Sequence, residues 1–201
     1  MEYIQSVAEL ESHYGQPAPA SLLKVTDKIT PAYRAWIARA RFCVLSTVGP
    51  DGVDASPRGD DAAVVHIQDE RTLLLPDWHG NNRIDSLRNI VADGRASLMF
   101  VVAGAQNVIR ANGHARLTTD APLRASFERQ GKHPRSVIEF RLSAIYFQCA
   151  RALMRARLWS DGDQSHGLPS MGDILSELGR DEFDGTSYDR MWPERARQTM
   201  W

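Results

Sequence analysis

The chain is poor in cysteine and lysine, and it has no large excess of charge of either sign. Its two cysteines, Cys43 and Cys149, are too few for a disulfide scaffold or a cysteine-based metal cluster. No apolar run is long enough to cross a membrane, and the N-terminus lacks a signal-peptide pattern. The formal net charge of −1 gives no general attraction to nucleic acid or acidic membrane. We therefore expect a cytoplasmic protein without nucleic-acid or membrane partners.

The composition is that of an ordinary globular protein, with 43% hydrophobic and 24% charged residues in 201. This length predicts one domain, residues 1–201. Arginine far outnumbers lysine, which favours bidentate contacts to phosphate or carboxylate but equally fits a GC-rich coding sequence. The histidines show no metal-ligand spacing and no Ser-His-Asp order stands out. We predict no metal site and assign no catalytic residue.

One stretch, residues 41–60, organises the rest of the prediction. Residues 42–48 alternate as a strand, and 49–52 (Gly-Pro-Asp-Gly) suit a tight turn. Residues 53–56 return as a second strand, which Pro57 is expected to end because it lacks an N–H. Arg58 then lies beside a glycine, where backbone can approach an anionic ligand. A plain hairpin with a surface arginine is the alternative interpretation.

The remaining pattern predicts short strands with tight turns between them. Within one of them, Gly113 indicates a β-bulge or a close backbone contact. A doubly wound sheet would need a helix after almost every strand, so we predict a mainly β fold, a small antiparallel barrel with peripheral helices. Its core covers about residues 30–160, with a C-terminal extension at 161–201. Further strands are expected at 62–67, 72–75, 95–102, 107–117 and 140–148, and helices at 6–15, from Pro31, at 83–92, 120–129 and 171–178.

A Gly/Asn-rich loop, residues 76–82, enters the helix predicted from Arg83. Such a loop offers unpaired N–H groups that can bind phosphate, and Asn81 or Asn82 can cap the helix. The loop is neither a Walker motif nor a dinucleotide-binding fingerprint, and an ordinary helix start explains it equally well. We expect Cys149 to be a packed thiol rather than a nucleophile.

Five short motifs follow one another along the chain. They are Ser56-Pro57-Arg58-Gly59-Asp60, Leu75-Pro76-Asp77, Gly80-Asn81-Asn82-Arg83, Arg110-x-Asn112-Gly113 and Gln148-Cys149-x-Arg151-Ala152 with Arg155 and Leu158-Trp159. Taken in this order, they resemble the pyridoxamine 5′-phosphate oxidase-like FMN-binding split-barrel family, and within it a bacterial branch of FMN-dependent enzymes. The resemblance spans about residues 30–160. It implies a six-stranded split barrel that forms a homodimer with FMN in each of two clefts at the subunit interface.

The resemblance also implies roles for individual residues. Arg58, Asn82 and Arg83 would bind the FMN phosphate, and Pro76 with Asp77 would lie beside the flavin ring or ribityl chain. The other implied contacts lie on the later strands and the segment after them, and the partner subunit is one possible source of the last group. They are Asn107 and Arg110 from a neighbouring strand, Gln148, Arg151 and Arg155 toward the ring or phosphate, and Trp159 covering the ring.

The implied activity is that of an FMN-dependent oxidoreductase that transfers a hydride to or from an unidentified small molecule, with NAD(P)H as a candidate electron donor. Residues 191–197 do not match the Arg- and His-containing segment with which the true oxidase binds pyridoxamine phosphate, so we do not expect that substrate. Two alternatives stay open. One is a non-catalytic carrier of flavin, haem or deazaflavin on the same barrel, and the other is a barrel that binds no flavin and serves as an interaction module.

Overall fold

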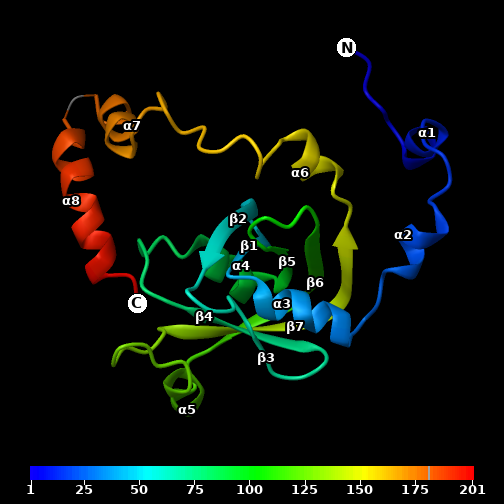
Figure 1. The fold of residues 1–201 in the computed structure, drawn as a ribbon, viewed down its shortest axis with the longest axis horizontal. Helices are drawn as coiled ribbons and strands as arrows, with labels where there is room; N and C mark the ends of the chain where they lie inside the picture. Colours follow the sequence, from blue (N-terminus) through cyan, green and yellow to red (C-terminus); the bar gives the residue numbers. More distant parts are fainter. Residues whose placement is uncertain (181) are drawn as a thin grey trace.

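A computed structural model describes residues 1–180 and 182–201 (Figure 1). The strands are β1 (Phe42–Gly49), β2 (Gly52–Gly59), β3 (His66–Ile67), β4 (Thr72–Asp77), β5 (Arg95–Val101), β6 (Val108–Thr118) and β7 (Ser136–Gln148). The helices are α1 (Val7–Ser12), α2 (Pro19–Leu23), α3 (Pro31–Arg39), α4 (Asp85–Ala92), α5 (Ala121–Ala125), α6 (Arg151–Arg155), α7 (Met171–Leu178) and α8 (Gly185–Gln198).

The strands form one antiparallel sheet in the order β2-β1-β5-β6-β7-β4-β3. The prediction of a mainly β fold with peripheral helices is confirmed, but the six strands that the resemblance implied are too few, because the described residues form seven, counting the short β3. That strand is only two residues long and pairs with Leu73 and Leu74, so most of the predicted strand 62–67 is irregular. Within the described residues, β2 and β4 do not pair, so the barrel stays open between them.

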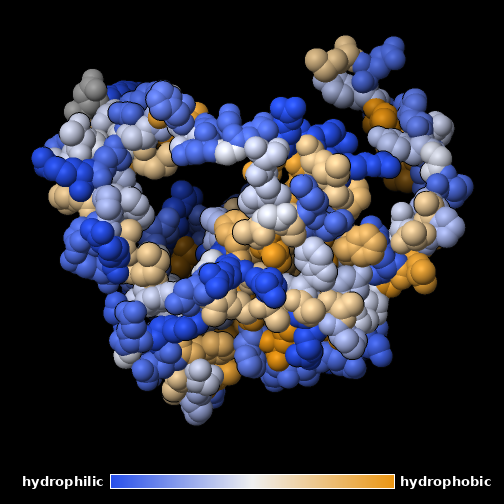
Figure 2. Space-filling view, in the orientation of Figure 1, coloured by the Kyte–Doolittle hydropathy of each residue, from blue (hydrophilic) through white to orange (hydrophobic). Residues whose placement is uncertain are grey.

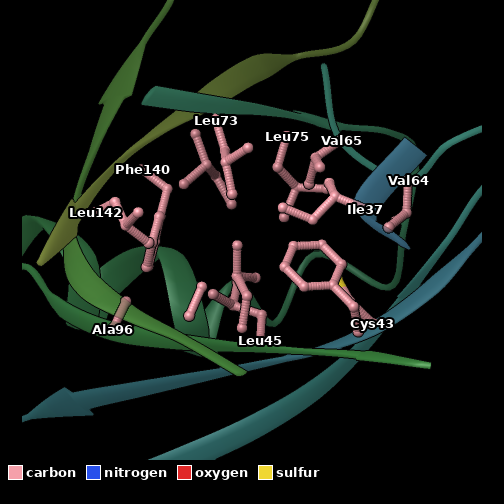
Figure 3. Close-up of a cluster of buried hydrophobic side chains, with 14 of the residues drawn as sticks. Ile37, Cys43, Leu45, Val64, Val65, Leu73, Leu75, Ala96, Phe140 and Leu142 are labelled. Carbon is pink, nitrogen blue, oxygen red and sulfur yellow. The ribbon is translucent and has the colours of Figure 1, made fainter. Parts of the chain in front are cut away.

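The inner surface of the curved sheet holds the hydrophobic core. Figure 3 shows side chains from β1, β4 and β7 pointing toward one another, with Leu45, Leu73 and Phe140 among them. All three are fully buried. Ile37 of α3 joins this cluster, and each such burial contributes about 1.5–3 kcal/mol relative to exposure. The core therefore fixes which face of β1, β4 and β7 points inward.

The predicted hairpin is present, and the inward face of β1 consists of Cys43, Leu45 and Thr47. The predicted turn is tight, since Gly49 already pairs with Gly52. The prediction that Pro57 ends the second strand is wrong, because pairing continues to Gly59. β2 is an edge strand, where a missing N–H interrupts no second ladder.

The bulge predicted at Gly113 is confirmed by a register shift between Asn112 and Gly113. A Cβ atom at Gly113 would lie 2.0 Å from the carbonyl oxygen of Arg141, so only glycine fits. The shift also changes the phase of β7, where Leu142 and Ile145 both point inward. A strict two-residue alternation along 140–148 therefore fails, since one residue of β7 has no partner opposite it.

The helices before the barrel begin largely as their caps predict. Thr30 caps α3 by accepting a hydrogen bond from the backbone N–H of Tyr33 at 3.4 Å. The helix predicted at 6–15 is shorter, covering Val7–Ser12, although its Ser6 cap is present. Between them lies the short helix α2, which starts at Pro19 as a proline in the first turn can.

The helix predicted at 83–92 begins two residues later, at Asp85. Its N-cap is Ile84, in a left-handed conformation with φ of 54°, and neither Asn81 nor Asn82 caps it. Asn81 instead accepts a hydrogen bond from the backbone N–H of Arg83 at 3.0 Å. The predicted cap is therefore wrong, because the loop turns sharply before the helix starts.

Residues 149–201, which we call the arm, follow β7 and cross to the other side of the molecule (Figure 1). The predicted α7 is confirmed, whereas the longer α8 was not predicted. The two helices cross closely, since a Cβ atom on Gly172 would lie 2.2 Å from the carbonyl oxygen of Gly185. Figure 2 shows hollows beneath the connection between α6 and α7. Among the described helices, none is long and apolar enough to span a bilayer.

Candidate functional site

A cavity of about 750 Å³ lies where the barrel is open. On one side is β2, whose outer edge has no strand beside it; on the other is the end of β4, which extends beyond the short β3. The loop before α4 and the start of β7 complete its walls. The lining residues are Pro57, Arg58, Gly59, Asp60, Asp61, Val64, Leu75, Pro76, Asp77, Trp78, His79, Gly80, Asn81, Asn82, Ile84, Leu87, Arg135, Ser136, Met200 and Trp201.

Arg58, one of the residues predicted to bind phosphate, enters this cavity from β2. Its Nε atom is buried and has no hydrogen-bond partner. The nearest carboxylate belongs to Asp77, with 3.9 Å between Nη2 and Oδ1, a separation at the limit of an ion pair. A buried guanidinium donor without an acceptor is costly, so the cavity has an unmet demand for an acceptor.

Asp77 ends β4 on the opposite side and also lines the cavity. Burial raises its pKa, and the positive charges of Arg58 and then Arg135 oppose that rise. Pro76 precedes it in β4 and is likewise part of the lining. At the opening of the sheet, the positively charged Arg58 of β2 thus faces the partly desolvated carboxyl group of Asp77 in β4.

Arg135 is a functional candidate that the sequence reasoning missed. Its Nη1 donates to Oδ1 of Asn82 at 2.6 Å, and its Nη2 lies 3.2 Å from Nδ1 of His79. The backbone N–H of Arg135 donates to the carbonyl of Asp77 at 2.9 Å, which fixes it beside β4. It precedes Ser136, where β7 begins. The predicted strand began at residue 140, so nothing placed Arg135 beside the loop.

The loop before α4 keeps only part of its predicted arrangement. Asn82 lines the cavity in a left-handed conformation with φ of 62°. Arg83 does not line it; its side chain is 77% exposed, and its Nε lies 2.9 Å from Oδ2 of Asp85. The structure thus brings Arg58 together with Arg135 rather than with Arg83.

The later predicted residues lie outside this cavity. Asn107 lines a second, smaller hollow beside α3 and donates from Nδ2 to the carbonyl of Gln148 at 2.9 Å. Arg110 stacks over the ring of Tyr146 on the outer face of the sheet, 5.3 Å from Cζ to the ring centroid. Both lie apart from the residues around Arg58.

The predicted residues of the arm also lie outside the first cavity. Arg151 and Arg155 begin and end α6, and both are exposed. Trp159 donates from Nε1 to the carbonyl of Ala105 at 2.8 Å, in the connection between β5 and β6. The first cavity therefore brings together Arg58, Pro76, Asp77 and Asn82, while Arg83, Asn107, Arg110, Gln148, Arg151, Arg155 and Trp159 lie elsewhere on this chain.

Comparison with known proteins places this geometry in context. A family model described as pyridoxamine 5′-phosphate oxidase matches residues 29–149. A crystal structure of HupZ from Group A Streptococcus shares the fold, with a TM-score of 0.50 and 17% identity over 60% of this chain and 99% of that one. No curated protein matches the chain in sequence.

Two other solved structures show a weaker likeness. One is General Stress Protein 26 from Bacillus anthracis, with a TM-score of 0.42 and 17% identity over 57% of this chain and 88% of that one. The other is an FAD binding protein from Mycobacterium smegmatis, with a TM-score of 0.41 and 12% identity over 61% of this chain and 97% of that one.

Proposed function

The chain belongs to the pyridoxamine 5′-phosphate oxidase family, and we propose that it is an FMN-dependent oxidoreductase acting on a small molecule. A shared fold does not define an activity, so the proposal depends on the site. The observation that carries it is the buried Nε of Arg58, which lacks a partner inside a cavity of about 750 Å³. That volume lies within the usual range of cofactor sites.

The cavity fits the two chemical halves of FMN. A phosphate dianion is best bound by arginine forks and loop N–H groups, which Arg58, Arg135 and the loop around Asn82 supply. Asp77 can accept hydrogen bonds from ribityl hydroxyls. Trp78 has a buried Nε1 without a partner, a second donor in the cavity that either FMN or its reaction partner could satisfy. Leu75 and Leu87 contribute apolar walls.

The chemistry itself belongs to the cofactor. Bound FMN supplies hydride transfer through its N5 atom, without requiring an acid or base from the protein. The residues of this chain would bind the phosphate, orient the ring against the second reactant and exclude water. No side chain in the cavity is assigned a catalytic role.

We further propose a homodimer that completes each site. Val44, Met99, Arg110 and Tyr146 are register neighbours in a row across the outer faces of β1, β5, β6 and β7. All are at least partly exposed, which is unusual for a strip containing such large apolar groups. The predicted contacts that lie away from the first cavity, from Arg110 to Trp159, would then face the FMN of the partner copy.

The phosphate assignment is tested by titrating FMN into the cofactor-free protein and following flavin fluorescence. Arg58→Ala should weaken binding about 10- to 150-fold, because a hydrogen bond to a charged group contributes about 1.5–3 kcal/mol. Arg135→Ala should weaken it in the same range. Arg88→Ala, which removes an exposed arginine of α4 outside the cavity, is the matched control and should have no effect.

Arg83→Ala decides between the sequence-based and the structural assignment. Binding like that of wild type supports Arg135 as the second phosphate residue, whereas a loss equal to that of Arg58→Ala would restore Arg83. Unchanged FMN affinity in Arg58→Ala would contradict the site. A yellow protein that NAD(P)H and other reductants cannot bleach, or one that prefers haem or deazaflavin, would favour the carrier alternative. A monomer that binds FMN would contradict the dimer.

A further inference from the structure

The arm returns to the cavity through the residues that follow α8. Met200 and Trp201 are part of the lining, although sequence reasoning assigned nothing to them. The indole of Trp201 packs edge-on against that of Trp78, with ring centroids 5.2 Å apart and an angle of 75° between the rings. Figure 1 shows α8 running from α7 back toward the barrel, with the end marked C beside it. One wall of the cavity is therefore a pair of indoles that lie far apart in the sequence, one after β4 and one after α8.

Contacts to the loop after α5 hold this wall in place. The guanidinium of Arg129 lies 5.7 Å from the ring centroid of Trp201. The same guanidinium is 3.2 Å from Oδ1 of Asp60 and 3.3 Å from Oδ1 of Asp61. Lys132 adds a hydrogen bond from Nζ to the carbonyl of Gln198 at 3.1 Å. Through Arg129, the indole is thus linked to Asp60 and Asp61, which line the cavity.

The charge in this corner differs from that around Arg58. Arg129 is shared by the carboxylates of Asp60 and Asp61, so this corner has no excess positive charge. It offers no counterpart to the Arg58 and Arg135 pair and would not hold a phosphate. What it offers is aromatic surface, which binds flat rings in offset or edge-on geometry. The corner therefore suits the ring of a reactant rather than an anionic group.

We propose that Trp78 and Trp201 form an aromatic wall that selects a planar ring, uncharged or cationic, as the second reactant. The proposal rests on the proposed function, because FMN would take the Arg58 corner and leave this wall to its reaction partner. Trp201 is then a residue that determines specificity and contacts the reactant without taking part in proton or hydride movement.

A pair of neutral probes tests the wall. Benzamide and cyclohexanecarboxamide have nearly the same size, but only the first is flat and aromatic. By calorimetric titration of the FMN-loaded protein, wild type should bind benzamide about 2- to 12-fold more tightly, the range that an aromatic pair gives. Trp201→Ala should remove that preference, and Trp201→Phe should retain most of it.

Trp192→Ala is the matched control. It also removes a stacked indole from the arm, since Trp192 lies 6.0 Å from Tyr188, but that indole does not line the cavity. It should keep the preference for benzamide. A wild type that fails to bind benzamide or binds both probes equally, or a Trp201→Ala variant that keeps the preference, overturns the proposal. The same titration without FMN separates the two proposals: a preserved preference in a protein that never binds FMN would support the wall and contradict only the flavin assignment.

Discussion

The barrel, residues 29–148, and the arm, residues 149–201, are held by different kinds of interaction. The buried apolar side chains of the core all fall between Ile29 and Ile145. In the described part of the arm, large apolar side chains such as Met154, Leu178 and Trp192 remain substantially exposed. Dispersion and the hydrophobic effect hold the barrel, whereas the arm depends on close backbone approach at glycines and a few hydrogen bonds.

Because of this difference, the part of the chain that provides stability is separate from a part that lines the cavity. A wall of the cavity that belongs to the arm can change without disturbing the core, while Arg58 and Asp77 stand on strands that the core fixes. Binding residues on rigid strands are positioned more accurately than those on a peripheral segment. The barrel is therefore suited to hold a constant cofactor and the arm to set which molecule meets it.

The two cysteines give the largest expected contrast between barrel and arm. Cys43 is fully buried in β1, and burial raises the pKa of its thiol to about 12 against the opposing charge of Arg58. Cys149 is exposed at the start of the arm, so the prediction of a packed thiol is wrong. A hydrogen bond from the backbone N–H of Arg151, helped by nearby charge, lowers the pKa of its thiol. In the FMN-free protein at pH 8, iodoacetamide should modify Cys149 at least about 1,000-fold faster, because Cys43 reacts only after unfolding.

Peptide mass spectrometry over time measures both rates in one sample. Mild urea should accelerate the modification of Cys43 while leaving that of Cys149 nearly unchanged. Comparable rates for the two thiols without urea would mean that β1 opens readily, and the barrel would then not be the more stable region.

Core truncation gives the next largest effect. Phe140 is fully buried in β7 among the side chains of Figure 3, so Phe140→Ala should lower the free energy of unfolding by about 3–5 kcal/mol. Trp192→Ala in the arm should lower it by about 1 kcal/mol or less, because that side chain is 49% exposed. Urea denaturation followed by circular dichroism measures both. Equal losses would show that the arm is part of the same cooperative core.

Sequence reasoning succeeded where local chemistry decides the structure. The alternation of Cys43, Leu45 and Thr47 predicted a strand, and the core confirmed which face is buried. Gly113 predicted a bulge because only glycine tolerates the close carbonyl of Arg141. Arg58 was predicted near the end of the hairpin, and it lies in the second strand. Each of these predictions was made from residue types and their spacing over a few positions, so the local pattern carries the information.

It failed where distant segments meet. Arg135 binds Asn82 across 53 positions of sequence, and no local pattern indicates that pairing. The same holds for Trp201 against Trp78, which join only because α8 returns to the barrel. Arg83 was misplaced for a different reason: the left-handed turn at Ile84 directs its side chain outward, and a β-branched residue is an uncommon choice there. The lining residues that lie on strands could thus be predicted from the sequence, whereas the contacts between segments on the two sides of the opening could not.

The smallest expected effect lies at that gap, where burial and charge oppose each other on Asp77. Burial dominates and raises the folded-state pKa above the unfolded value of about 3.9. The native state then holds the proton more tightly, so the Asp77 contribution is most favourable below that value and is lost as pH rises through the folded pKa. Asp77→Asn removes the ionisation. In FMN-free protein it should be as stable as wild type near pH 3.5 and slightly more stable at pH 7, by urea denaturation across that range. A variant that is less stable at pH 7 would show that the attraction to Arg58, 3.9 Å away, outweighs burial, and that an occupied cavity is not needed to satisfy either group.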